Sequence, residues 1–445
     1  MAAVVFALVA LVVLALLGAV HRYVWRRFVG DTTAPGSRLR RAGTVAAFVL
    51  PLLSVGAMTS GRVGAPFWLQ QVLAWPGFLW LACLLYLTLA LLVGEVVRPV
   101  LLRVLARRDA ARSTVSDETR PRTEELVTSG SAGVSAPSDA VTRTASDAPG
   151  PVVQPEAEPV KEPSAATPAL HPSRRLFVSR VVGGAAATAG LATVGYGAYG
   201  VLRGPSVRRI TVPLARLPRA AHGFRIAVVS DIHIGPILGR AHTRRIVDTI
   251  NATSPDLVAV VGDLVDGSVA DLGSAAEPLA ALRARHGSYF VTGNHEYFSG
   301  AEQWVDHVRE LGLVPLENAR VEIAGFDLAG VNDIAGETEG QGPDFGRALG
   351  DRDRGRAAVL MAHQPVVIHD AVEHGVDLQL SGHTHGGQLW PGNLLAELAN
   401  PTVAGLERYG DTQLFVSRGA GAWGPPVRVG APSDITVVEL ASRQA

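Results

Sequence analysis

Two histidines one residue apart, His383 and His385, stand in the stretch SGHTHGGQLW (residues 381–390). In an extended segment, positions i and i+2 point to the same side, so both imidazoles can face one object. Glycines on both sides of the pair allow the backbone to turn tightly. By itself the pattern is weak evidence for a metal site, because surface histidine pairs and His-rich loops often produce it, although imidazole is a common metal ligand. A metal site therefore needs partners elsewhere in the chain.

Four further short motifs supply such partners: DIH, GDLVD, GNHE and AHQP. Their ionisable and amide side chains are Asp231, His233, Asp263, Asp266, Asn294, His295, Glu296 and His363. Each motif alone fits a turn or a satisfied polar residue at a strand end. Together with GHTH, they bring imidazole and oxygen ligands to five predicted strand ends. Such ligands without a thiolate suit Mn, Fe or Zn better than Ca.

The segments that precede these motifs predict the elements that position them. From residue 206 onward, "FRIAVVSDIH", "DLVAVVGDLVDG", "SYFVTGNHE", "AAVLMAHQP" and "VDLQLSGHTH" each predict a buried strand, and "AHTRRIVDTINA" predicts a helix. "TQLFVSRGA" and "DITVVEL" predict further strands that close the sheet. Continuous apolar strands that alternate with helices imply sheets covered by helices. In such α/β folds, the chemistry lies at the strand ends.

The order DxH, GDxxD, GNH(D/E), H, GHxH resembles the calcineurin-like metallophosphoesterases, directly over about residues 224–388. The resemblance implies an α/β fold, a four-layer α/β/β/α sandwich, with two divalent metal ions between the strand ends. Mn is the preferred metal, with Fe or Zn as alternatives. One metal would be held by Asp231, His233, Asp263 and His385. The other would be held by Asp263 as a bridge, with Asn294, His363 and His383.

By the same resemblance, the chain is a binuclear phosphohydrolase. Metal coordination lowers the pKa of water towards about 7, so a metal-bridging hydroxide can attack phosphorus at neutral pH. His295 matches the catalytic histidine that is not a metal ligand, acting as general acid, and Asp266 matches the residue that orients it. Alternatively, Asp266 caps a helix or turn. Glu296 is interpreted as a structural residue at a helix start.

Other polar and aromatic residues give weaker signals. Asn332 and Asp333 either line the site or form a turn. Trp390 either stacks on substrate, contacts lipid or packs at the rim of the site. Six histidines outside the motifs are interpreted as surface or ordinary core residues: His222, His242, His286, His307, His369 and His374.

The first part of the chain has the composition of a membrane protein. Apolar runs at residues 3–20, 43–59 and 75–97 predict a membrane region over residues 1–108 with about three transmembrane helices. The second run is short, so a re-entrant segment is the alternative. The formal net charge of zero gives no indication of nucleic-acid binding. Cys83 is the only cysteine, so a disulfide within the chain is excluded.

Two segments separate this region from the predicted catalytic domain, residues 206–445. Residues 109–172 are rich in Ala, Ser, Thr, Pro and acidic residues and predict a disordered linker. Residues 173–203 begin with "SRRLFVSR" and continue as a Gly/Ala-rich apolar run. This segment resembles a twin-arginine export signal, and a fourth transmembrane helix is the alternative. A third alternative is a buried helix that leaves the domain in the cytoplasm.

Arginines indicate the orientation in the membrane. They cluster between the first and second apolar runs and again after the third, whereas Arg62 stands alone between the second and third. The positive-inside rule then places the N-terminus outside and residue 98 in the cytoplasm. A crossing by residues 173–203 returns the chain to the outside. We therefore expect a multi-pass protein of a bacterial cell membrane with an extracytoplasmic catalytic domain.

The expected function is a phosphodiesterase or pyrophosphatase acting on a cell-envelope or lipid-linked phosphoester. Protein phosphatases usually carry GDxxDRG, but here Gly267 and Ser268 follow Asp266, which disfavours that subclass. The alternative is a non-catalytic membrane-bound sensor or ligand-binding protein. Such a protein is expected to have lost part of its site, whereas Asp263 and His295 are both present.

Overall fold

The computed structural model describes residues 2–118, 174–323 and 325–444. The chain divides into two compact units, Met1–Val97 with Ser179–Ala445, and Arg98–Val178. The first unit contains two six-stranded sheets, and these sheets position the predicted metal ligands.

The first sheet has the strand order β1-β12-β2-β3-β4-β5. Its strands are β1 (Ser206–Leu214), β2 (Phe224–Val229), β3 (Leu257–Val261), β4 (Ser288–Val291), β5 (Val314–Pro315) and β12 (Asp434–Ser442). Strands β2 to β5 run parallel, and β12 lies antiparallel to β2. All residues of β3 and β4 are buried, because helices cover one face and the second sheet covers the other. Burial on both faces explains why these strands are continuous apolar runs.

The second sheet has the strand order β10-β11-β9-β8-β7-β6. Its strands are β6 (Ala319–Ile323), β7 (Phe326–Gly330), β8 (Ala357–Met361), β9 (Leu378–Ser381), β10 (Gly405–Tyr409) and β11 (Thr412–Val416). The four central strands are parallel, and β6 and β10 are antiparallel edge strands. The predicted strands in "TQLFVSRGA" and "DITVVEL" are confirmed as β11 and β12, one in each sheet.

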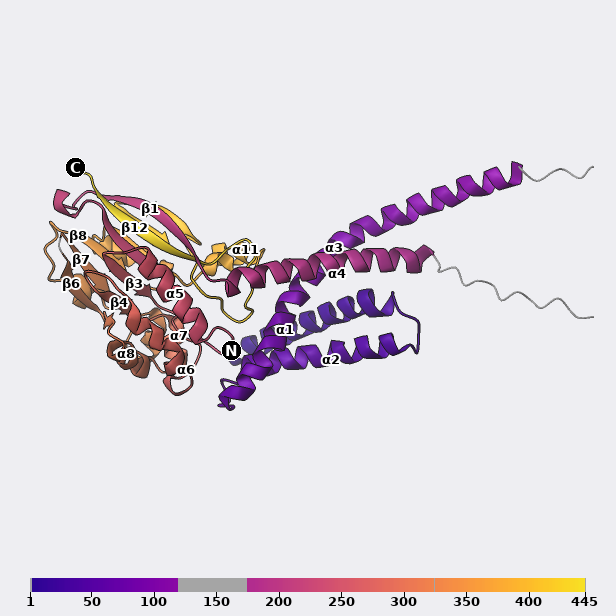
Figure 1. Ribbon diagram of the computed structural model, residues 1–445, viewed down its shortest axis with the longest axis horizontal. Helices are drawn as coiled ribbons and strands as arrows, with labels where there is room; N and C mark the ends of the chain where they lie inside the picture. The colour runs from indigo at the N-terminus through magenta and orange to yellow at the C-terminus, as the bar shows by residue number, and fades with distance from the viewer. Residues whose placement is uncertain (1, 119–173, 324, 445) are drawn as a thin grey trace, which may run out of the picture. The chain divides into compact units, whose positions relative to one another are not determined.

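The two sheets pack face to face, with helices outside them (Figure 1). Between the sheets, the rings of Phe224 and Phe326 meet edge to face at 5.1 Å. The first sheet is covered by α5 (Arg240–Ala252), α6 (Val269–Ala276) and α8 (Ala301–Glu310). The second is covered by α9 (Phe345–Leu349) and α10 (Ile368–Glu373). The predicted four-layer α/β/β/α fold is therefore confirmed.

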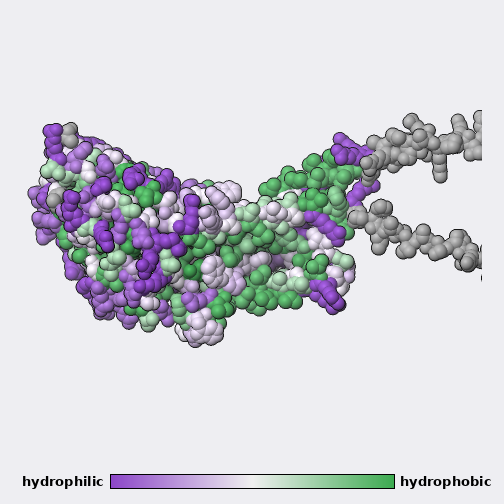
Figure 2. All heavy atoms as spheres, viewed as in Figure 1, coloured by the Kyte–Doolittle hydropathy of each residue, from purple (hydrophilic) through white to green (hydrophobic). Residues whose placement is uncertain are grey.

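In the part of the chain that the structure describes, four α-helices precede β1: α1 (Ala2–Trp25), α2 (Arg38–Thr59), α3 (Phe67–Glu118) and α4 (Arg174–Leu202). Among the described residues, three stretches are long and apolar enough to cross a membrane: Arg38–Thr59, Phe67–Arg108 and Arg174–Leu202. Hydrophobic residues gather over these helices, and hydrophilic ones over the two-sheet domain (Figure 2). These helices suggest membrane association.

The first apolar run and the predicted linker are only partly described by the structure. The first apolar run forms α1, but several of its side chains lie outside the described residues. Helix α3 continues to Glu118, so it extends past the predicted start of the linker at residue 109. The remainder of that linker, from residue 119, lies outside the described residues.

Candidate metal centre

The predicted ligands follow the strands of both sheets directly. Asp231 and His233 follow β2, and Asp263 follows β3. Asn294 follows β4 and opens the short helix α7 (Asn294–Ser299). In the second sheet, the ligands follow β8 and β9, namely His363, His383 and His385. Since parallel strands end at a common edge, the loops of the two stacked sheets converge there.

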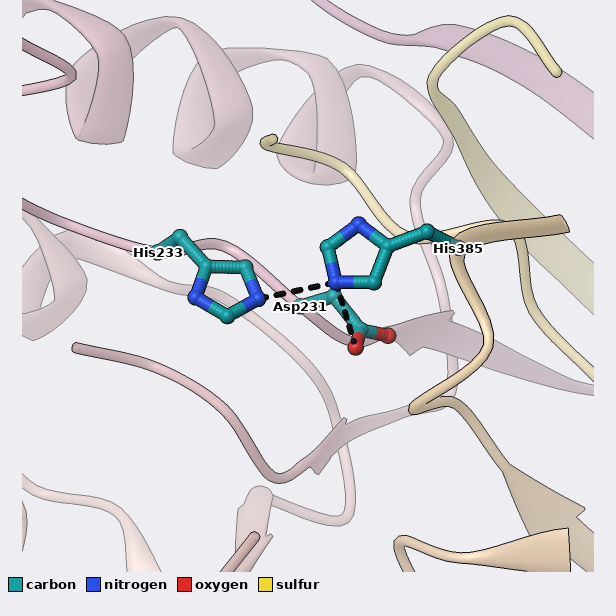
Figure 3. Close-up of side chains that lie close together, drawn as sticks. All are labelled: Asp231, His233 and His385. Atoms are coloured by element: carbon teal, nitrogen blue, oxygen red, sulfur yellow. Dashed lines mark hydrogen bonds and ion pairs between the residues drawn. The ribbon is translucent and has the colours of Figure 1, made fainter. Parts of the chain in front are cut away.

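One group that could hold a metal ion comprises Asp231, His233 and His385 (Figure 3). The Nε2 atom of His385 lies 3.3 Å from Asp231 Oδ1 and 2.9 Å from His233 Nε2. Two imidazole nitrogens and a carboxylate oxygen therefore face one point, and all three residues are buried.

A second such group comprises Asp263, His363 and His383. Asp263 Oδ2 lies 3.2 Å from His363 Nε2 and 3.8 Å from His233 Nε2, so this carboxylate faces both groups. Asn294 Oδ1 lies 3.0 Å from His383 Nδ1. The structure thus brings all seven predicted ligands together in two adjoining groups, with His383 and His385 in different ones.

The backbone at these residues is held in an unusual conformation. Asp231, His233, Asp263, His383 and His385 all have positive φ, between 49° and 71°. A non-glycine residue with positive φ costs free energy and persists only where the surrounding structure imposes it. Among the described residues, eight non-glycine residues show positive φ, and five of them are predicted ligands. This concentration of strain indicates that the loops are shaped for a site.

The donor atoms of these residues fit a divalent cation. His363 Nδ1 hydrogen-bonds to the carbonyl oxygen of Val261 at 2.8 Å, which leaves Nε2 facing Asp263. That Nε2 atom is buried, and among the described residues it has no partner with hydrogen-bond geometry, although Asp263 Oδ2 lies 3.2 Å away. A buried unsatisfied polar atom is costly, and a cation would satisfy it. Metal-ligating histidines usually bond a carbonyl or carboxylate through their other nitrogen, as His363 does.

The carboxylate of Asp266 joins the site to His295. Asp266 Oδ1 lies 2.8 Å from His233 Nδ1 and 2.8 Å from His295 Nδ1. The sequence predicted that Asp266 orients His295 alone. In the structure this carboxylate also contacts His233, a predicted metal ligand. His295 is also fixed through its backbone, because its N–H donates to Asp263 Oδ1 at 2.9 Å.

Burial and charge shift the pKa values of these groups in opposite directions. Burial lowers the pKa of His233, but the carboxylates of Asp266, Asp263 and Asp231 together outweigh burial and raise that pKa to about 9. Burial raises the pKa of Asp266, but His233 and His295 together outweigh it and lower that pKa to about 2. Burial, reinforced by His363, lowers the pKa of His383 to about 4. Without a metal ion at neutral pH, the Asp266 carboxylate is therefore ionised, the His233 imidazole is protonated and the His383 imidazole is neutral.

Two positioning residues lie behind the ligands. Arg428 is buried and donates to the carbonyl oxygen of His385 at 3.0 Å and to its Nδ1 at 3.1 Å. Sequence reasoning missed this arginine, which has no motif around it. Glu296 lies in the first turn of α7 and accepts hydrogen bonds from the backbone N–H groups of Gly293, Asp263 and Leu264. It is therefore a structural residue, but it ties two ligand loops together in addition to capping a helix.

Two aromatic rings flank His295, and sequence reasoning missed both. The ring centroids of Phe298 and Trp423 lie 5.6 Å and 5.7 Å from that of His295. Both side chains are exposed. Gln388 holds Trp423, because its Nε2 donates to the Trp423 carbonyl oxygen and its Oε1 accepts from the Trp423 N–H. The protein surface beside His295 is consequently apolar.

The residues with weaker signals lie outside the metal groups. Asp333 accepts from the N–H of Ala335 and from Gln364 Nε2, so it forms a turn next to His363. Asn332 bonds the carbonyl oxygen of Gln341 in the same turn. Among the described residues, none of the six histidines outside the motifs belongs to a group that could hold a metal ion.

The fold and the paired Asp/His groups at its strand ends define a class, the metal-dependent phosphoesterases that hydrolyse phosphoric esters. A family model described as calcineurin-like phosphoesterase matches residues 224–387. This range contains all seven predicted metal ligands.

Relatives in distant organisms share this domain. A "Transmembrane protein with metallophosphoesterase domain" of Danio rerio is 38% identical over 259 residues, covering 55% of this chain and 59% of that protein. An "Uncharacterized metallophosphoesterase" of Helicobacter pylori is 38% identical, covering 56% of this chain and 68% of that protein. An "Uncharacterized metallophosphoesterase" of Aquifex aeolicus is 33% identical, covering 53% of this chain and 91% of that protein. The chain therefore belongs to the calcineurin-like phosphoesterase family, although it spans only 59% of the Danio rerio protein's length.

Proposed function

We propose that this protein is a binuclear phosphodiesterase or pyrophosphatase that acts on a cell-envelope or lipid-linked phosphoester. The observation that carries the proposal is the convergence of two Asp/His groups on Asp263 beside the Asp266–His295 pair. A non-catalytic sensor would have no need for this last pair, so that alternative is not favoured.

Seven residues would hold the metal ions, in the two sets that the sequence predicts. Asp231, His233, Asp263 and His385 form one set, and Asp263, Asn294, His363 and His383 form the other. Two bound divalent ions would supply Lewis acidity and an activated water at neutral pH. Mn²⁺ is proposed as the native ion, with Fe²⁺ or Zn²⁺ as alternatives, because the donors are nitrogen and oxygen only.

His295 would supply the proton that the reaction needs. Hydrolysis breaks a phosphorus–oxygen bond, and the departing oxygen must be protonated. Asp266 holds His295 through Nδ1, which leaves Nε2 to donate to that oxygen. Phe298 and Trp423 shield the ring on its sides, so its direction of donation is restricted.

The membrane assignment is part of the proposal. Four helices would form a multi-pass anchor in a bacterial cell membrane, with residues 1–108 as the first membrane region. Residues 173–203 would be a twin-arginine-like signal or a fourth crossing, which puts the catalytic domain, residues 206–445, outside the cytoplasm. The apolar length of Arg174–Leu202 supports a crossing at this point.

Turnover of two chromogenic substrates tests the proposal. The full chain in detergent is stripped of metal, reloaded with Mn²⁺, Fe²⁺ or Zn²⁺, and assayed on bis-p-nitrophenyl phosphate and p-nitrophenyl phosphate. We expect metal-dependent cleavage that prefers the diester. Asp263→Ala should lose both the bound metal and the cleavage. His295→Ala should retain the metal and cleave more slowly. A preference for the monoester would contradict the phosphodiesterase assignment, and tight metal binding without turnover would favour the sensor.

A further inference from the structure

Helix α11 (Gly392–Ala399) presents an apolar ridge to the outside of the protein. The side chains of Leu394, Leu395 and Leu398 are 56%, 71% and 84% exposed. Leu398 lies four residues after Leu394 and three after Leu395, and residues three or four apart are neighbours on a helix surface, so the three leucines form one ridge. Leucines concentrated on one exposed helix mark a surface that binds a membrane or another protein.

The ridge continues as exposed aromatic residues towards the metal centre. Trp390 stands directly before α11 and is exposed, as are Trp423 and Phe298 beside His295. Gln388, two residues before Trp390, hydrogen-bonds both backbone groups of Trp423. We call these six residues the apolar rim: Phe298, Trp390, Leu394, Leu395, Leu398 and Trp423.

The rim is fixed to the candidate membrane helices. The hydroxyl of Tyr86 in α3 donates to the carbonyl oxygen of Trp390 at 3.0 Å. Leu389 packs in the same hydrophobic cluster as Tyr86 and as Val194 of α4. The N–H of Arg428 donates to the carbonyl oxygen of Gly197, also in α4. Contacts from two helices therefore hold the segment that leads into α11.

Tyrosines near Gly197 indicate where the bilayer surface lies. Tyr196 and Tyr199 are exposed on α4, close to its end at Leu202. Tyrosines at the ends of membrane helices usually sit at the level of the lipid headgroups. Because Gly197 contacts the segment beside Trp390 at this level, the adjoining helix α11 lies where an interfacial helix would lie.

We propose that the apolar rim inserts into the bilayer interface and holds the opening of the metal centre at the membrane surface. The occupant of the surface is the lipid bilayer. Glu397 is the only charged residue of α11, so insertion rests on apolar burial and not on attraction to anionic lipid. If the proposed hydrolase function holds, the substrate is a phosphoester whose hydrocarbon chain remains in the bilayer while its phosphate reaches His295.

The depth of spin labels tests the inference without any measure of activity. The full chain with Cys83→Ser is reconstituted in phosphatidylcholine vesicles, and nitroxides are attached at Leu395→Cys or Leu398→Cys. Val314→Cys in β5, also an exposed apolar position, is the matched control. Collision with oxygen, which concentrates in lipid, is compared with collision with a water-soluble nickel chelate.

We expect the labels on α11 to collide with oxygen and to be shielded from nickel, with the reverse at position 314. Nickel access on α11 equal to that at position 314 would overturn the proposal. Shielding from both reagents would also overturn it, because a second copy of the chain or another protein would then cover the ridge. A failed hydrolase assay would leave this readout unaffected, so the two proposals fail separately.

Discussion

Removal of the charge on Asp266 is expected to weaken metal binding as well as catalysis. This carboxylate lies 2.8 Å from both His233 Nδ1 and His295 Nδ1. Burial lowers the pKa of His233, but Asp266, together with Asp263 and Asp231, outweighs burial and raises that pKa to about 9. Relative to the ordinary value of 6.5, this net shift corresponds to ~3 kcal/mol, so the three carboxylates together contribute more than that at His233. Loss of the partner of a ligating histidine typically lowers metal affinity about 10- to 100-fold. We expect Asp266→Asn to fall in that range.

The pH of the measurement decides what is seen. At pH 7, His233 is protonated, so protons compete with the metal ion, and Asp266→Asn relieves part of that competition. At pH 9 the competition is small, so the weaker ligand becomes visible. We would measure Mn²⁺ affinity by calorimetry under argon at both pH values, with His295→Ala as the control that keeps the Asp266–His233 contact. If Asp266→Asn binds Mn²⁺ at pH 9 as tightly as the parent while its turnover falls like that of His295→Ala, Asp266 acts through His295 alone and the reasoning is wrong.

Three further predictions concern protons and buried polar groups. Mn²⁺ binding at pH 7 should release about one proton or more, because His233 must become neutral to bind the ion. Calorimetry in buffers of different ionisation enthalpy measures this release. Binding heats that do not depend on the buffer would contradict the prediction. Arg428→Lys keeps the charge but not the forked contacts to Gly421, Ala431 and His385, so thermal unfolding of the metal-free protein should show a loss of ~3 kcal/mol, and an unchanged midpoint would refute the assigned role. Burial lowers the pKa of His242 to about 4, below its ordinary 6.5, so its neutral form stabilises the fold above pH 6.5 and this contribution is lost as the pH falls towards 4. In His242→Leu the acid sensitivity of unfolding in EDTA should shrink by up to ~3 kcal/mol, whereas an unaltered pH dependence would show that this imidazole does not titrate as proposed.

The catalytic fold could be predicted from the sequence because its strands are buried on both faces. That burial makes segments such as 257–261 continuous apolar runs, which are easily recognised. The polar residues that end the runs converge because parallel strands share an edge, so the grouping of Asp263 with His363 follows from topology. The assignment of individual ligands to metal ions stays a prediction.

The surroundings of the ligands could not be predicted, since they depend on loops that meet only in the folded chain. Arg428 lies in a loop without periodicity, and nothing in the sequence links it to His385. Phe298 and Trp423 are single aromatic residues in different loops, so neither forms a pattern that could be read. The contact of Asp266 with His233 in addition to His295 likewise requires three dimensions.

Electron paramagnetic resonance of the Mn²⁺-loaded full chain tests the central claim, that His383 and His385 serve two metal ions joined by Asp263. Metal content is determined on the same samples. We predict two Mn²⁺ ions per chain with an exchange-coupled spectrum, and loss of the coupling in Asp263→Ala. A single Mn²⁺ per chain, or the simple hyperfine pattern of isolated ions at full loading, would contradict the account.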